Sequence, residues 1–150
     1  MRKFLLYLTG CMILLFSITM FSCSSDNDIE DEIQKRQYNF FDVVEMINDG
    51  KYDDALRRIN EVYNDIDYST EIDGFNKMNL LRLFYEKQGL YDNAADVVKQ
   101  YIVENGLSRY SINESDLDHV TAIKCMEALL EKVDEDTHKN LIQQLGEEWQ

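Results

Sequence analysis

Proline is absent from the 150 residues of this chain, and histidine occurs only twice, as His119 and His138. Because proline interrupts helices, its absence is typical of a chain whose helices run without a break. A zinc or hydrolytic site needs about three converging ligands, and Cys125, a candidate partner of His119, falls on another face of a helix. The sequence also lacks a Ser-His-Asp spacing, a nucleophile elbow, a phosphate-binding glycine loop and a CxxC pair. These absences predict a protein that is not an enzyme and holds no metal and no cofactor.

Basic residues are few, with 15 Lys and Arg against 29 Asp and Glu, and the formal net charge is −14. A chain of this charge is repelled by the phosphates of nucleic acids and by anionic lipid head groups. Acidity also keeps an exposed protein soluble. Nucleic acid is therefore excluded as a partner, and a partner with a basic or polar binding segment is favoured.

Residues 1–22 have the three parts of an export signal. Arg2 and Lys3 form a positive start, residues 4–21 are mostly apolar, and a serine supplies the small residue expected before a cleaved bond. With Cys23 directly after it, the segment resembles the signals of bacterial lipoproteins, in the looser form found in Bacteroidetes. The resemblance implies that the signal is removed and that Cys23 carries a covalent lipid. An uncleaved membrane anchor and a plain secretory signal are the alternatives.

An acidic tract follows this cysteine, and residues 23–32 are predicted to form a tether between the lipid and the folded domain. Such a tract buries no apolar surface and stays solvated. It resembles the acidic signal of Bacteroidetes lipoproteins that are sent to the cell surface, and the residues that carry the resemblance are Ser25, Asp26, Asp28, Glu30, Asp31 and Glu32. We therefore expect an outer-membrane lipoprotein on the periplasmic face or, in preference, on the cell surface.

A six-residue motif occurs twice, from Gly50 to Ala55 and from Gly89 to Ala94. Each copy follows an apolar segment of helical period. Glycine suits the left-handed C-terminal cap of a helix, and the aspartate after each tyrosine is placed to accept the free amides of the next helix. The alanine lets two helices approach, and the tyrosine fills the wedge between them. The motif predicts a helix, a tight turn and a second helix, with structural roles for Gly50, Tyr52, Ala55, Gly89, Tyr91 and Ala94.

These residues look like the turn of a tetratricopeptide repeat, a helical hairpin of about 34 residues. The second copy departs from the family at Arg82, where a small residue is usual, and matches it at Leu81, Tyr85, Gly89, Tyr91 and Ala94. The resemblance implies an all-α domain over residues 33–150, built as a short α-solenoid of about three antiparallel hairpins. The expected hairpins cover residues 36–66, 71–105 and 112–150.

The third hairpin lacks the turn motif, so its prediction depends on apolar spacing. Ser111 and Glu114 form a candidate capping box. They precede a stripe of Leu117, Val120, Ile123, Met126, Leu130 and Val133. Asp134 is expected to begin the last helix, whose buried stripe is Leu141, Ile142, Leu145 and Trp149. Between the first two hairpins, residues 67–74 are expected to form a polar loop.

The family resemblance implies that the first helices of successive hairpins line a concave groove that holds a peptide or partner segment. In the better copy, the outward residues of the first helix are Asn76, Asn79, Leu83, Glu86 and Lys87. The sequence thus predicts a non-enzymatic, lipid-anchored protein that binds a protein or peptide partner, itself membrane-associated, at the outer membrane. The alternative is an immunity or exclusion lipoprotein that neutralises an incoming toxin or competing element, and binding of a small ligand or glycan is a third interpretation. The oligomeric state stays open.

Overall fold

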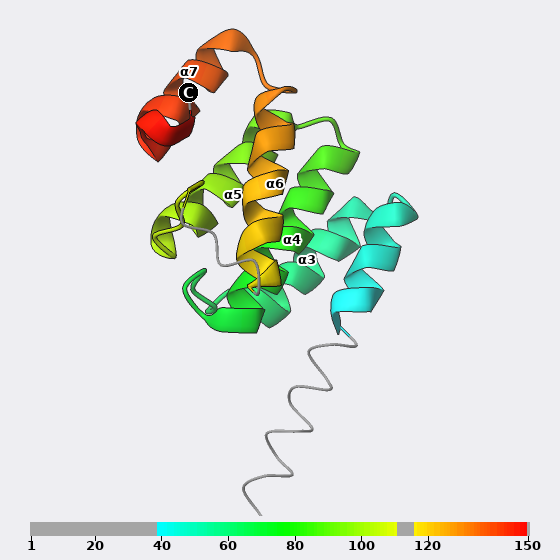
Figure 1. Cartoon of the computed structure of the whole chain (residues 1–150). Coiled ribbons are helices and arrows are strands. Elements are labelled where there is room, and N and C mark those ends of the chain that lie inside the picture. Colours follow the sequence, from blue (N-terminus) through cyan, green and yellow to red (C-terminus); the bar gives the residue numbers. More distant parts are fainter. Residues whose placement is uncertain (1–38, 111–115, 150) are drawn as a thin grey trace, which may run out of the picture. The chain divides into compact units, whose positions relative to one another are not determined.

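The computed structural model describes residues 39–110 and 116–149, and the regular structure of this part is helical. A helix over residues 39–48 is followed by α3 (Tyr52–Tyr63), α4 (Glu71–Lys87), α5 (Tyr91–Glu104), α6 (Leu117–Leu130), α7 (Glu135–Leu145) and a short 3₁₀ helix, η1 (Glu147–Trp149). In the described part, six α-helices pack in consecutive antiparallel pairs (Figure 1). The predicted all-α class is confirmed. The predicted signal and tether, with Cys23, lie outside the described residues.

Tight turns at glycine join the helices of the first two pairs. Gly50 has φ of 74° and Gly89 has φ of 72°, a left-handed conformation that other residues resist. The Gly50 N–H donates to the Ile47 carbonyl at 3.1 Å, and the Lys51 N–H donates to the Met46 carbonyl at 2.8 Å. The same two bonds, at 3.0 and 2.9 Å, close the turn at Gly89. Each pair of bonds is a Schellman cap, which satisfies carbonyls at the end of the first helix.

The aspartates of the motif do not cap the helices that follow. Lys51 and Leu90 occupy the N-cap positions of α3 and α5, and neither makes a capping bond through its side chain. Asp53 and Asp92 lie inside the first helical turn, where the helix dipole favours a carboxylate. The prediction of capping aspartates is wrong because each helix already begins at the tyrosine directly before them.

The tyrosines of the motif contact the next helical pair in a similar way. The Tyr52 hydroxyl donates to the carbonyl of Lys87, at the end of α4, at 3.3 Å. The Tyr91 ring lies below the Lys132 ammonium, just beyond the end of α6, with 5.2 Å between nitrogen and ring centroid. Each tyrosine therefore lies against the C-terminal end of the first helix of the following pair, so the two motifs have equivalent places in the fold.

The buried side chains form two cores that share α4. Leu80 and Phe84 face the first core, and Met78 faces the second, so opposite sides of one helix are covered. The first core also takes Val43, Ile47, Ala55, Ile59 and Tyr63 from the first pair. The second core joins α4 to α5, α6, α7 and η1, and its buried residues include Ala94, Val98, Tyr101, Ile102, Ile123, Met126, Leu129, Leu141 and Trp149. α4 is therefore the central element of the described part.

The third pair uses side chains where the first two use glycine turns. As predicted, Asp134 caps α7: it accepts the Thr137 N–H at 2.8 Å, and this bond holds the pKa of its carboxyl below the usual range. The His138 Nδ1 lies 2.8 Å from the Leu130 carbonyl at the end of α6. The expected stripe of α7 is buried or half-buried in the second core. The side chains of Asp134 and His138 thus help to satisfy the two helix ends at this turn.

The start of α6 differs from its prediction. Asp116 is the N-cap of this helix, and its carboxylate accepts the His119 N–H at 3.3 Å. The candidate capping residues Ser111 and Glu114 lie outside the described residues. Leu117, expected in the buried stripe, is 72% exposed. Its apolar spacing suggested burial, but it lies at the first helical position, on the side of α6 opposite the second core.

Gly74 is part of α4 and not of the loop before it. The predicted loop over residues 67–74 is wrong at its end, because α4 begins at Glu71 and Gly74 is buried in its first turn. A Cβ added at Gly74 would lie 2.8 Å from the carbonyl carbon of Tyr68. Glycine therefore permits the backbone before α4 to pack directly against the helix.

We expect Gly74→Ala to lower the free energy of unfolding by about 1–3 kcal/mol, because the added methyl group displaces the Tyr68 backbone. Helix propensity alone predicts the opposite sign, a gain of about 0.5–1 kcal/mol. Urea denaturation followed by circular dichroism measures the difference. A more stable Gly74→Ala protein would contradict the close approach.

Candidate partner-binding surface

Four of the five residues predicted to face a partner share one stripe of α4. Asn76, Asn79, Leu83 and Glu86 are spaced by three, four and three residues, which places them on one face of a helix. All four are half-buried. Ile72, one turn earlier on the same face and 64% exposed, extends the stripe toward the start of α4. We call these five residues the α4 stripe; Lys87, also predicted, is exposed beside its far end.

Neighbouring elements flank the α4 stripe on both sides. Leu83 packs against the first core, which the first helical pair contributes. On the other side, Glu86 accepts a bond from Arg82 at 2.9 Å, and its second oxygen lies 3.9 Å from the Lys132 ammonium beyond α6. The stripe therefore contains amide, apolar and charge-paired groups, and it is flanked by the first and third helical pairs.

Arg82 organises the polar side of the α4 stripe. Its Nη2 donates to the Asn79 side-chain oxygen at 3.3 Å, and its Nη1 donates to Glu86. Its Nε is buried and has no hydrogen-bond partner in the described part of the chain. The half-buried Cys125 on α6 is close enough for the guanidinium to lower its pKa, but burial of the thiol dominates and raises it. The departure from the repeat pattern at Arg82 was visible in the sequence, but its partners were not.

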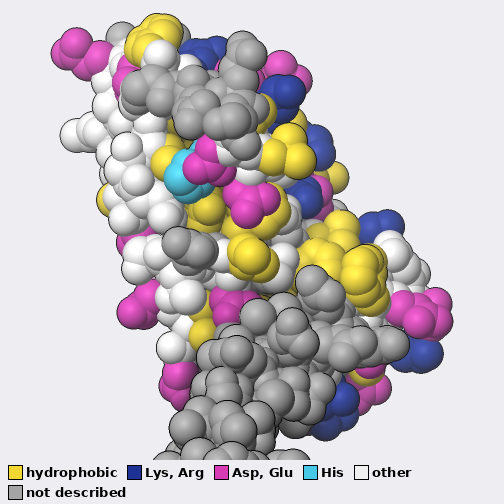
Figure 2. Space-filling view, turned by 60° about the horizontal axis from the view of Figure 1, so that its bottom comes forward, with side chains coloured by type: hydrophobic (Ala, Val, Ile, Leu, Met, Phe, Trp, Pro, Cys, Tyr) yellow, Lys and Arg dark blue, Asp and Glu magenta, His cyan; other side chains and the backbone are white. Residues whose placement is uncertain are grey.

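A cavity of about 380 Å³ lies at the end of the stripe where α4 begins. Four segments meet there: the loop after α3, the start of α4, the end of α5 and the start of α6. The residues around it include Ile72, Tyr101, Asn105, Asp116, Asp118 and His119. Figure 2 turns this end of the domain forward and shows a histidine side chain among acidic and hydrophobic ones. The sequence did not indicate this cavity, because its residues are far apart in the chain.

Acidic and aromatic groups converge in this cavity. The His119 Nδ1 lies 2.7 Å from an Asp116 carboxylate oxygen. Burial, followed by the charge of Asp116, raises the pKa of the Asp118 carboxyl. Tyr101 is only 2% exposed, and burial with the nearby Asp118 and Asp116 charges raises the pKa of its hydroxyl to about 12. The phenol group is thus neutral near pH 7 and lies near the two carboxylates.

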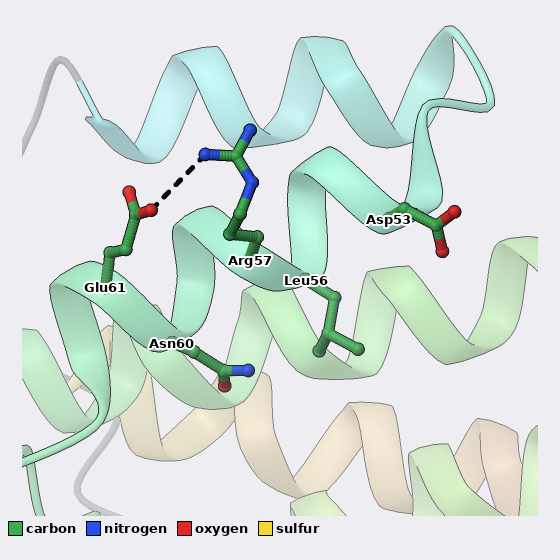
Figure 3. Close-up of a pocket in the computed structure, with 5 residues that line it drawn as sticks. All are labelled: Asp53, Leu56, Arg57, Asn60 and Glu61. Atoms are coloured by element: carbon green, nitrogen blue, oxygen red, sulfur yellow. Dashed lines mark hydrogen bonds and ion pairs between the residues drawn. The ribbon is translucent and has the colours of Figure 1, made fainter.

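A second depression lies along α3 and is more open to solvent than the cavity. Figure 3 shows that its side chains come from that helix alone and that Arg57 points toward Glu61. Arg57 bonds Glu61 at 3.3 Å and Asp54 at 2.8 Å, so its charge is already compensated. All of these groups are exposed. In the α3 depression the charge of Arg57 is thus paired with acids of the same helix, and its amide, Asn60, lies on an exposed surface.

Within the described ranges, no group of three or more His, Cys, Asp or Glu side chains is placed to hold a metal ion. No helix in the same ranges is long and apolar enough to cross a membrane. Comparison with protein-family models, with curated proteins and with solved structures finds no match for this chain.

Proposed function

We propose that this protein is a non-enzymatic, lipid-anchored scaffold of the outer membrane, and that its tetratricopeptide-like helical array binds a protein or peptide partner along the α4 stripe. Three observations support the proposal. The N-terminal sequence resembles a lipoprotein signal ending at Cys23. The helices pack in antiparallel pairs, and two of the turns carry the same motif. The first helix of the second pair presents a mixed polar and apolar stripe.

The state of the amides on the α4 stripe carries the proposal. In the described part of the chain, the Asn76 side chain makes no hydrogen bond, and Asn79 uses only its oxygen, to accept from Arg82. Amide side chains in this state can both donate to and accept from the backbone of a bound peptide. Leu83, one helical turn after Asn79, offers apolar contact. A half-buried stripe with unused donors and acceptors is suited to a peptide segment.

The lipid anchor adds to the proposed binding. A partner that is itself membrane-associated is confined to the same surface, which raises the effective concentration of both molecules. A small surface such as the α4 stripe then suffices for binding that would be weak between freely diffusing molecules. The tether of residues 23–32 lets the domain reach its partner.

Site-specific photocrosslinking in the native cell tests this proposal. With benzoylphenylalanine at Asn76, we expect a crosslinked adduct of one discrete mass. Asn60, on the α3 depression, is the matched control, because it is an asparagine on a helix of the neighbouring pair. No adduct is expected there. The proposal would be wrong if no adduct formed at Asn76, or if Asn76 and Asn60 gave adducts in equal yield. An adduct with an incoming toxin, and not with a resident envelope protein, would select the immunity role instead.

A further inference from the structure

The cavity at the start of α4 contains an acid, Asp118, that forms no ion pair with the described residues. Asp116 is engaged twice by His119, through its backbone N–H and its ring. Asp118 has no ion pair and no hydrogen bond from its side chain to the described residues. Burial and the Asp116 charge raise its pKa and outweigh the nearby His119, which acts in the opposite direction. A half-buried carboxylate in this state favours a cation beside it.

An independent feature of the same cavity is the hydroxyl of Tyr101. This side chain is 98% buried, lines the cavity and lies near both carboxylates. Its hydroxyl makes no hydrogen bond within the described ranges and keeps some access to solvent, although the side chain as a whole is buried. A buried phenol usually finds a partner. Its oxygen is therefore available, with the Asp118 carboxylate, to accept hydrogen bonds from a donor that enters the cavity.

The side chains that line the cavity determine which chemical class of ligand it can bind. Two carboxylates repel an anion, and the described residues offer no cluster that would hold a metal ion. The exposed Ile72 side chain and the aromatic ring of Tyr101 suit an apolar stem. An ammonium or guanidinium group on an aliphatic chain supplies both the charge and the donors that the cavity lacks. Lysine and arginine side chains have this construction.

We propose that this cavity binds a lysine or arginine side chain of the segment that lies along the α4 stripe. Ile72 belongs to both the stripe and the cavity wall, so a peptide on the stripe passes the cavity mouth. In the bound state, the Asp118 carboxylate and the Tyr101 hydroxyl accept hydrogen bonds from the cation. The inference rests on the proposed function for the identity of the segment, but the preference of the cavity for a cation stands on its own residues.

The two histidines of the chain make a direct test possible. His119 lines the cavity, and His138 lies on α7 beside the end of α6, so it is an internal control. The full-length lipoprotein, labelled at histidine and held in detergent micelles, is titrated with Nα-acetyl-lysine methylamide, its arginine analogue and the uncharged norleucine analogue. His138→Gln assigns the two NMR signals. We expect both cationic probes to shift the His119 signal saturably, and the His138 signal to stay in place.

Matched substitutions define the role of Asp118. Asp118→Asn keeps the shape of the side chain and removes its charge, and we expect it to weaken binding of the cationic probes by about tenfold or more. Asp136→Asn is the control, because Asp136 also lies in the first turn of a helix capped by aspartate. It should leave binding unchanged. An unchanged thermal midpoint shows that both variants are folded.

Three results would overturn the inference: a His119 signal that no cationic probe shifts, an equal response to norleucine, or unchanged binding by the folded Asp118→Asn protein. These results are independent of the crosslinking at Asn76. A crosslinked partner with an unresponsive cavity refutes the cation site alone. A responsive cavity without any adduct at Asn76 refutes the partner surface alone.

Discussion

Phe84→Ala is expected to lower the free energy of unfolding by about 3–5 kcal/mol, the range for removing a buried phenylalanine ring. Phe84 is 6% exposed and belongs to the first core, although it comes from the second helical pair. Its ring meets the Tyr52 ring edge to face, with 5.9 Å between centroids, and it also contacts Tyr85. The substitution therefore opens a cavity between two pairs and not within one. Urea denaturation followed by circular dichroism measures the change.

The control for this prediction is Phe41→Ala on the helix over residues 39–48. Phe41 also lies on the first helix of a pair, but it is 69% exposed. Its loss should change the free energy of unfolding by less than about 0.5 kcal/mol, as is usual for exposed positions. Equal effects of the two substitutions would show that the first pair does not pack on α4 as described.

Cys23→Ser is expected to release the protein from the membrane entirely. If Cys23 carries the lipid, a chain with serine in its place has no acyl groups. Stable membrane anchoring needs more than one acyl chain, so the substituted protein loses its anchor. Fatty-acid labelling and fractionation of the cell envelope measure the outcome. We expect no label on the Cys23→Ser protein.

Cys125→Ser is the matched control, because Cys125 is the free cysteine of α6 and should have no part in lipidation. It should keep both the label and the membrane fraction. A Cys23→Ser protein that stays in the membrane would indicate the uncleaved anchor. A native protein without label and outside the membrane would indicate the plain secretory signal.

The local features of the fold could be predicted from the sequence because they depend on short-range chemistry. The turns at Gly50 and Gly89 need a left-handed residue after an apolar helix, and glycine in that place is specific. Asp134 followed by a helical pattern likewise predicted the start of α7. The prediction that Asp53 and Asp92 cap their helices was wrong. Apolar spacing does not locate the first residue of a helix to better than one or two positions, and these helices begin one residue earlier.

Features that depend on contacts between distant segments could not be predicted. Nothing in the sequence near Gly74 shows that the Tyr68 carbonyl packs against it. Four residues of the α4 stripe were predicted from the register of the family resemblance, but the cavity at its end needs Tyr101 of α5 beside Asp118 and His119 of α6. Only the fold brings His119 next to the buried Tyr101.

The yield of the Asn76 crosslink in the lipidated protein and in the Cys23→Ser protein, compared at equal amounts in the same cells, tests the central claim most directly. If a tethered scaffold holds a membrane partner on the α4 stripe, the adduct should form with the lipidated protein and fall by about a hundredfold without the lipid, because the effective concentration is lost. An equal yield from both proteins would contradict the role of the tether. No adduct from either protein would contradict binding at the α4 stripe.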